Sequence, residues 1–229
     1  MRSALNARLL SAAELTRQGA YLADVGTDHA YLPLFLLSEG RINFAYATDI
    51  NEGPLASARR NAEEAGLVDK MDFLLTDGAA ALSGKGITDY TICGMGGELI
   101  RDIIDRAVHL KSESVNLILQ PMSRQEKLRE YLAREGFRIV KESYSYDAGK
   151  YYVCMLATFD GTPREISSLE SQIGAKDVEI VNKTCQKGYI EAKIASLTRA
   201  VEGKKCAGKG DDEDARLLLE MKEALKNIS

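Results

Sequence analysis

Asp24-Val25-Gly26-Thr27-Asp28-His29 closes a short apolar run at residues 21–25 and precedes a helical stretch at 30–39 that ends before Gly40. The same order recurs directly afterwards, with a strand-like run at 44–49 and a helical stretch at 55–65. Strands that alternate with helices are typical of parallel βαβ units. This stretch therefore predicts the first strand and turn of an α/β sheet.

The remaining front part of the chain continues the pattern. Strands are predicted at residues 71–75, 90–93, 116–120, 137–141 and 151–159, with a leading helix at 5–16 and a further helix at 98–108. A capping box from Ser123 to Glu126 predicts another helix that ends at Gly136. The last two strands are joined by a polar turn at 147–150, which indicates a hairpin. We expect a seven-stranded sheet with helices on both faces and its last strand antiparallel.

The pattern changes after residue 160. Thr162, Pro163 and Glu165 fit a helix start with a capping box, and no further strand is evident. Two apolar stripes follow at helical spacing, one at residues 190–201 and one at 218–228, separated by a glycine-lysine turn at 203–210. The expected organisation is a sheet domain at residues 1–160 and an α-helical hairpin at 163–229.

Composition excludes several classes of protein. The chain has 229 residues, of which 45% are hydrophobic and 28% charged, and a formal net charge of −4. These values suit a globular protein and argue against disorder or a globally basic nucleic-acid binder. No apolar run is long enough to span a bilayer. The four cysteines form no CxxC pair, so the sequence predicts a cytoplasmic protein with reduced thiols and no metal site.

Acidic residues close the first three predicted strands, where ligands of parallel sheets bind. Asp24 opens the first loop, which lacks the G-x-G-x-x-G of a dinucleotide site and suits an ammonium group better than a phosphate. Asp49 is placed to accept ribose hydroxyls, and Asp77 to accept a proton from an adenine amino group. Each residue alone is equally consistent with a turn or a helix cap. Together they describe S-adenosylmethionine.

Three segments carry a family resemblance. Asp24-Val-Gly-Thr-Asp-His-Ala-Tyr-Leu-Pro33, Gly94-Met-Gly-Gly97 and Leu119-Gln-Pro-Met122 resemble the tRNA (adenine(22)-N(1))-methyltransferase family, TrmK. The match covers roughly residues 1–160, and the tail resembles the family's C-terminal coiled-coil domain more loosely. The resemblance implies a Rossmann-like class I methyltransferase that uses S-adenosylmethionine to methylate N1 of adenine 22 in bacterial tRNA.

The resemblance also implies site residues. Those expected to line the cofactor are Asp24, Gly26, Asp49, Ile50, Asp77, Gly78 and Gly94. Those expected to face the reacting base are Asp28, His29, Tyr31 and Met95. Adenine N1 carries an in-plane lone pair, so catalysis needs alignment and stabilisation of the cationic product, for which Asp28 is the candidate.

An adenine N1 lies on the Watson–Crick edge, so the base must be exposed before transfer. Folded RNA is held mainly through its phosphates. The expected basic contacts are Arg2, Arg8, Arg17, Arg59 and Arg60. Two alternatives stay open: a methyltransferase with a small-molecule or protein acceptor, and an adaptor that binds cofactor or RNA without turnover. A nicotinamide dehydrogenase is disfavoured by the missing glycines. The oligomeric state stays open.

Overall fold

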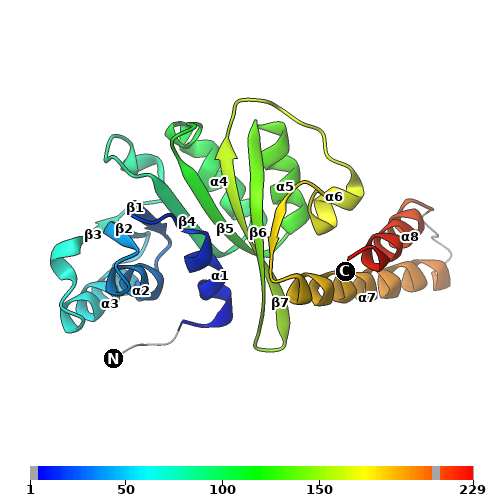
Figure 1. Ribbon diagram of the computed structural model, residues 1–229, viewed down its shortest axis with the longest axis horizontal. Helices are drawn as coiled ribbons and strands as arrows, with labels where there is room; N and C mark the ends of the chain where they lie inside the picture. The colour runs from blue at the N-terminus through cyan, green and yellow to red at the C-terminus, as the bar shows by residue number, and fades with distance from the viewer. Residues whose placement is uncertain (1–4, 208–211, 229) are drawn as a thin grey trace.

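The computed structural model describes residues 5–207 and 212–228, and in them one mixed sheet runs through the molecule (Figure 1). Its eight strands have the order β3-β2-β1-β4-β5-β7-β6-β8. The strands are β1 (Ala20–Val25), β2 (Ile42–Asp49), β3 (Met71–Leu75), β4 (Asp89–Gly96), β5 (Asn116–Ser123), β6 (Phe137–Asp147), β7 (Lys150–Phe159) and β8 (Glu179–Val181).

Strands β1 to β5 are parallel, and β7 is antiparallel to both of its neighbours. The hairpin turn between β6 and β7 contains Ala148 and Gly149, both with positive φ (46° and 82°). Two successive left-handed residues match the twist of the strands that they join. The predicted order of strands, the hairpin and the antiparallel last strand of the front part are therefore confirmed.

Helices cover both faces of the sheet. One apolar cluster packs α1 (Ala7–Leu15), α2 (Tyr31–Ser38) and α3 (Glu52–Glu64) against one face. A second cluster packs α4 (Gly97–Arg106) and α5 (Gln125–Arg134) against the other face. The second cluster also includes residues of the tail, which contains α6 (Ser168–Ile173), α7 (Lys183–Cys206) and α8 (Asp212–Lys226). The chain crosses from one face to the other after β3. The neighbouring strands β1 and β4 are therefore followed by helices on opposite faces, and the chain diverges between their carboxyl ends.

The sheet has eight strands where seven were predicted. β8 is a short strand in the tail that pairs in parallel with β6, from Lys141 opposite Glu179 to Ser143 opposite Val181. Three residues are too few to show an alternating pattern, and the free edge of β6 supplies the pairing. The tail is thus joined to the sheet before its long helices begin.

Both predicted capping boxes are wrong. Ser123 is the last residue of β5, and the cap of α5 is Arg124, which is left-handed at φ 56° and makes no side-chain cap bond. The stretch that starts at Thr162 is not helical; the capping box of α6 lies five residues later, between Ser167 and Glu170. Thr162 and Glu165 are thus not the pair that forms the capping box, and the helix begins later than predicted.

The two apolar stripes of the tail are buried as predicted. Ile190, Val201 and Met221 belong to the core, and α7 packs along α8 (Figure 1). Helix α7 extends through Gly203 to Cys206, so the predicted turn begins later than expected. The rest of that turn, residues 208–211, lies outside the described residues. Within the described ranges no helix is long and apolar enough to cross a membrane.

Candidate active site at the carboxyl ends of the strands

The turn after β1 is pinned by its backbone. The N–H groups of Gly26 and Thr27 both donate to the carbonyl oxygen of Thr48, each at 2.8 Å. Gly26 has φ +74°, and a Cβ at this position would collide with the methyl group of Met95. Glycine is therefore favoured at position 26 by its left-handed conformation, and the end of the flexible Met95 side chain, from β4, packs against it.

Asp24 is a buried carboxylate without a cation. Its Oδ2 accepts from the Thr27 hydroxyl at 2.6 Å and its Oδ1 from the Thr91 hydroxyl at 2.8 Å. Burial raises the pKa of Asp24, and the two hydroxyl bonds oppose this shift. Among the described residues no Lys, Arg or His forms an ion pair with it. A cationic group of a ligand would stabilise the ionised form of this side chain.

The next residues of the turn adopt a strained conformation. His29 (φ 62°) and Ala30 (φ 56°) are both left-handed, and the Asn61 side chain donates to the His29 carbonyl oxygen at 2.9 Å. Ala30 is the cap of α2, so Asp28 does not cap that helix. The Asp28 side chain is 82% exposed, and its Oδ1 lies 3.1 Å from His29 Nε2. Backbone strain of this kind persists where the surrounding structure holds a functional group in place.

His29 and Tyr31 present two aromatic rings beside this carboxylate. Their centroids are 5.3 Å apart and their planes are inclined by 23°, which is a stacked arrangement. Tyr31 is 42% exposed. The turn after β1 thus brings Asp28, His29 and Tyr31 together on an accessible surface, and their contact with the reacting base stays a prediction.

Asp49 closes β2 with part of its carboxylate available. Its Oδ1 accepts from the Asn51 backbone N–H at 2.8 Å, which orients the side chain. Ile50 follows and is 64% exposed, so it offers an apolar surface next to that carboxylate. This is the arrangement expected for a ribose hydroxyl pair with a base packed beside it.

Asp77 is engaged by a residue that the sequence did not indicate. Arg106, in the last turn of α4, donates to both of its carboxylate oxygens, with Nη1 to Oδ2 at 2.7 Å and Nη2 to Oδ1 at 3.3 Å. Gly78 is left-handed at φ +73° and makes the turn next to this pair. In the present arrangement Asp77 is thus the partner of Arg106, and its contact with an adenine amino group stays a prediction.

The carboxyl end of β4 contains a bulge. Cys93 pairs with Gln120 and Met95 with Pro121, so Gly94 (φ +79°) has no partner in the ladder. Its N–H donates to Gln120 Oε1 at 3.1 Å, and the same oxygen accepts from Arg8 Nη1 at 2.6 Å. Gly94 and Met95 are thereby brought to the crevice beside Gly26, as the sequence predicted.

Of the five arginines assigned to RNA, Arg8 and Arg17 have partners within the protein and Arg2 cannot be placed. Arg8 lies inward on Gln120. Arg17 forms an ion pair with the buried Asp89 at 2.7 Å, at the opposite end of β4 from the crevice, and so has a structural role. Arg2 lies outside the described residues. Arg59 and Arg60 are exposed on α3, with the Arg59 guanidinium 4.6 Å from the Phe73 ring centroid.

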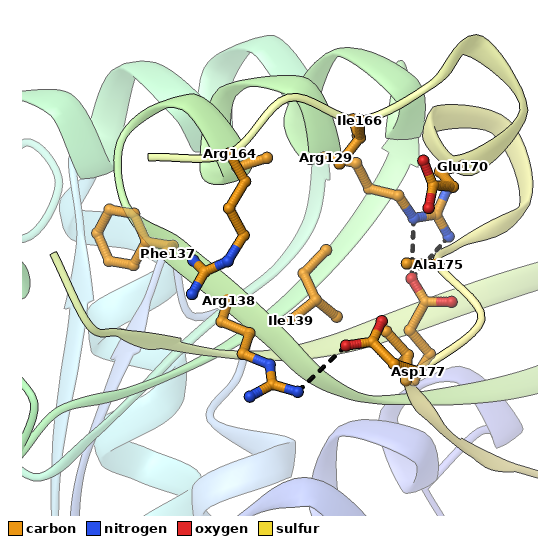
Figure 2. Close-up of a pocket in the computed structure, with 12 residues that line it drawn as sticks. Arg129, Phe137, Arg138, Ile139, Arg164, Ile166, Glu170, Ala175 and Asp177 are labelled. Atoms are coloured by element: carbon orange, nitrogen blue, oxygen red, sulfur yellow. Dashed lines mark hydrogen bonds and ion pairs between the residues drawn. The ribbon is translucent and has the colours of Figure 1, made fainter. Parts of the chain in front are cut away.

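A second polar centre lies away from the crevice, where β6, α5 and the tail meet (Figure 2). Arg129 is 2% exposed; its Nε donates to Glu142 Oε1 at 2.8 Å and its Nη1 to the Ser171 carbonyl oxygen at 3.0 Å. Burial alone would lower the pKa of Arg129, but the Glu142 carboxylate more than offsets this and the pKa is raised. The charges of Arg129 and Glu142 compensate each other within this buried polar centre. The bond from Arg129 to Ser171 connects the tail to the sheet.

The chain matches known proteins along most of its length. The methyltransferase-domain family matches residues 5–155. The tRNA (adenine(22)-N(1))-methyltransferase of Bacillus subtilis is 36% identical over 154 residues, which are 67% of this chain and 64% of that relative. The match therefore spans slightly less than two thirds of the Bacillus protein.

Solved structures extend the likeness over the whole fold. The candidate tRNA (m1A22) methyltransferase Sp1610 of Streptococcus pneumoniae, in complex with S-adenosyl-L-methionine, is 32% identical, with a TM-score of 0.79 and coverage of 98% of this chain and 99% of that one. M. capricolum TrmK, in complex with S-adenosyl-homocysteine, is 27% identical, with a TM-score of 0.80 and the same coverage. This chain belongs to the tRNA (adenine(22)-N(1))-methyltransferase family. The resemblance seen in the three sequence segments is confirmed, as is the Rossmann-like methyltransferase fold.

Several residues that hold the candidate site together were not indicated by the sequence. Thr27 and Thr91 hold Asp24, and Thr48 pins the turn after β1. Gln120 was visible in the Leu119-Gln-Pro-Met122 segment, but nothing local indicated what its side chain binds. Arg106 was read only as part of an amphipathic helix. Within the described residues no group of three or more His, Cys, Asp or Glu side chains could hold a metal ion.

Proposed function

We propose that this chain transfers the methyl group of S-adenosylmethionine to N1 of adenine 22 in tRNA. The observation that carries the proposal is Asp24, a buried carboxylate held by two hydroxyls and no cation, at the carboxyl end of the first strand. An ammonium group of an amino-acid ligand would complete its coordination. Asp49 and Ile50, at the end of the neighbouring strand, suit a ribose and a base.

The residues present fit the proposed cofactor. The turn at Gly26 allows close approach to the backbone, and Gly94 with Met95 forms the facing wall. When bound, S-adenosylmethionine would supply an electrophilic methyl on a sulfonium. Asp77 supports an adenine only if Arg106 shares its carboxylate, so its contribution is proposed to be smaller than that of Asp49.

The acceptor base would be held by the strained turn. Asp28 is exposed and paired with His29 at 3.1 Å, so its negative charge lies at the mouth of the crevice. Methylation of N1 leaves a cationic adenine, and a carboxylate nearby stabilises that charge as it develops. Tyr31 and His29 offer stacked rings on which a base displaced from its helix can rest.

The RNA is proposed to approach over the exposed arginines of α3 and along the tail. Arg59 and Arg60 supply phosphate contacts near the crevice. The hairpin of α7 and α8 extends from the other end of the sheet (Figure 1) and is proposed as a coiled-coil docking element. In this division, residues 1–160 bind cofactor and carry out transfer, and residues 163–229 contribute to holding tRNA.

The test is methyl transfer from labelled S-adenosylmethionine to unmodified bacterial tRNA transcripts, followed by nucleoside analysis. The expected product is N1-methyladenosine, which disappears when adenine 22 is replaced by guanine. Label that enters a small amine or a protein instead of RNA would contradict the acceptor. Binding of S-adenosylhomocysteine without transfer to any RNA would contradict the catalytic proposal and favour an adaptor.

A further inference from the structure

Arg8 lies on the leading helix, but its side chain turns inward and binds a buried glutamine of the sheet. It belongs to α1, yet its guanidinium lies at the carboxyl ends of β4 and β5 and donates to Gln120 Oε1 at 2.6 Å. Gln120 itself is fully buried. A charge-assisted bond of this length to a buried amide oxygen is strong and directional.

The amide of Gln120 replaces a missing bond of the sheet. The register of β4 and β5 shifts between Cys93 and Met95, so Gly94 is an extra residue whose N–H meets no strand carbonyl. Gln120 Oε1 accepts that N–H at 3.1 Å, while its Nε2 donates to the Pro121 carbonyl oxygen at 3.2 Å. Bulges commonly redirect a side chain next to an active site.

The redirected side chain is Met95. Its methyl group lies so close to Gly26 that any Cβ there would collide with it. Contacts therefore run from Arg8 to Gln120, from Gln120 to the Gly94 bulge, and from the bulge through Met95 to the turn after β1. Every link is a hydrogen bond or a direct contact in the described structure.

We propose that Arg8 is a positioning residue: by holding the Gln120 amide it fixes the Gly94 bulge and sets Met95 against the Gly26 turn for methyl transfer. The inference rests on the proposed function, because it assigns Met95 to the wall between methyl donor and acceptor base. Arg8 acts in this proposal through Gln120 and the Gly94 bulge, and not by direct contact with either substrate. Its positive charge holds Gln120 in one rotamer, because Arg is a donor only and the amide oxygen must face it.

The alternative is that Arg8 contacts a tRNA phosphate, as its place on the leading helix suggested. A phosphate contact acts independently of Gln120, weakens tRNA binding, and depends on salt concentration. A positioning role acts through Gln120 and changes the turnover of bound substrates. A double-mutant cycle separates the two, because residues that act through one contact are not additive.

The experiment compares Arg8→Met, Gln120→Met and the double variant, with Arg8→Lys as the conservative change and Arg138→Met as the matched control. Arg138 is half-exposed and pairs with Asp177 far from the crevice. We expect Arg8→Met to lower kcat about tenfold or more, with KM for tRNA and its salt dependence unchanged, as loss of one hydrogen bond to a charged group implies. The double variant should be no worse than Gln120→Met, and Arg8→Lys should restore part of the rate.

A readout independent of catalysis keeps the test decisive. Hydrogen exchange of the Gly94 amide should accelerate about tenfold in Arg8→Met and in Gln120→Met, and stay unchanged in Arg138→Met. If Gln120→Met does not fold, the comparison of Arg8→Met with Arg8→Lys by the same exchange measurement decides the role of Arg8. Additive losses, a change confined to KM for tRNA, or an unaltered Gly94 exchange rate would overturn the proposal. If the unmodified protein methylates no tRNA, the proposed function fails, while the exchange measurement still decides the role of Arg8.

Discussion

Two buried carboxylates of the same sheet have opposite surroundings. Glu142 on β6 faces Arg129, which is itself buried, and accepts from the Tyr144 hydroxyl as well. Asp24 on β1 faces two threonine hydroxyls, and no cation pairs with it in the part of the chain that the structure describes. Folding pairs the first carboxylate with a cation and gives the second only hydroxyl donors, which is the basis for proposing Asp24 as a ligand contact.

The comparison separates stability from function in physical terms. An ion pair that is desolvated together with its partner becomes part of the fold, because removing either member leaves an uncompensated charge. A lone buried carboxylate costs stability when it is ionised, which is why the pKa of Asp24 is raised by burial. A bound cation would offset the free energy lost by burying this carboxylate. The partners of a buried charge therefore indicate its role better than its burial does.

The largest expected effect breaks the first member of the pair. Glu142→Gln removes the counter-charge of Arg129 and should lower the free energy of unfolding by about 3–5 kcal/mol. Affinity for S-adenosylhomocysteine should be unchanged in the fraction that is folded. Denaturant unfolding and calorimetry provide the two values. Arg138→Ala, which breaks the exposed pair with Asp177, is the control and should cost less than about 1 kcal/mol.

A loss of cofactor affinity confined to Glu142→Gln, with stability intact, would reverse the assignment of the two carboxylates. The tail would then be part of the binding site and not its support.

The second effect concerns the other strand end of the crevice. Asp49→Ala removes the proposed ribose acceptor and should weaken S-adenosylhomocysteine binding by about 1.5–3 kcal/mol, the range for hydrogen bonds to charged groups. Stability should change little, because the Asp49 carboxylate accepts from the backbone N–H and the side chain of Asn51, which lies two residues further along the chain. Calorimetric titration measures the affinity, and an unchanged dissociation constant would remove Asp49 from the cofactor site.

The third effect tests the buried polar centre around Arg129 and Glu142 through its dependence on pH. Lys193 on α7 donates to Gln172 and lies beside Tyr189; burial, with the Arg129 charge, lowers its pKa to about 8. A lysine whose folded pKa lies below its unfolded value favours the folded state when neutral, so this contribution is complete above the unfolded value of about 10.5 and is lost as pH falls through 8.

Below pH 8 the free energy of unfolding of Lys193→Met should therefore exceed that of the unmodified protein by on the order of 1 kcal/mol. This difference should shrink toward pH 10. Unfolding curves of both proteins at several pH values give the difference directly. If the difference in free energy of unfolding between the two proteins does not vary with pH, Lys193 is solvated and lies outside the buried polar centre.

The sequence was sufficient for much of the fold because alternating apolar runs and helical stripes are local patterns. β1 to β7 and the apolar stripes of the tail followed from them. β8 did not, because a three-residue strand is specified by the free edge of β6 and not by its own pattern. The helix starts at Ser123 and Thr162 were misplaced for a similar reason, since two segments matched a motif that only tertiary packing selects.

Site residues divide in the same way. The carboxylates and glycines at strand ends were predictable, because a strand end places its next residue at the crevice. The partners of these residues were not, because Arg8 and Gln120 are 112 residues apart in sequence and Arg106 meets Asp77 from the end of a helix. Arg17 is a further case: the sequence suggested an RNA contact for it, and the structure shows its ion pair with the buried Asp89.

The central claim is that Asp24 is reserved for the ammonium group of the methyl donor. The most direct measurement is a calorimetric titration of the unmodified protein and Asp24→Asn with S-adenosylhomocysteine and with its analogue that lacks the amino group. Asp24→Asn should weaken S-adenosylhomocysteine binding at least about tenfold, leave the des-amino analogue unaffected, and keep the melting temperature at neutral pH. Equal weakening of both ligands, or of neither, would contradict the account.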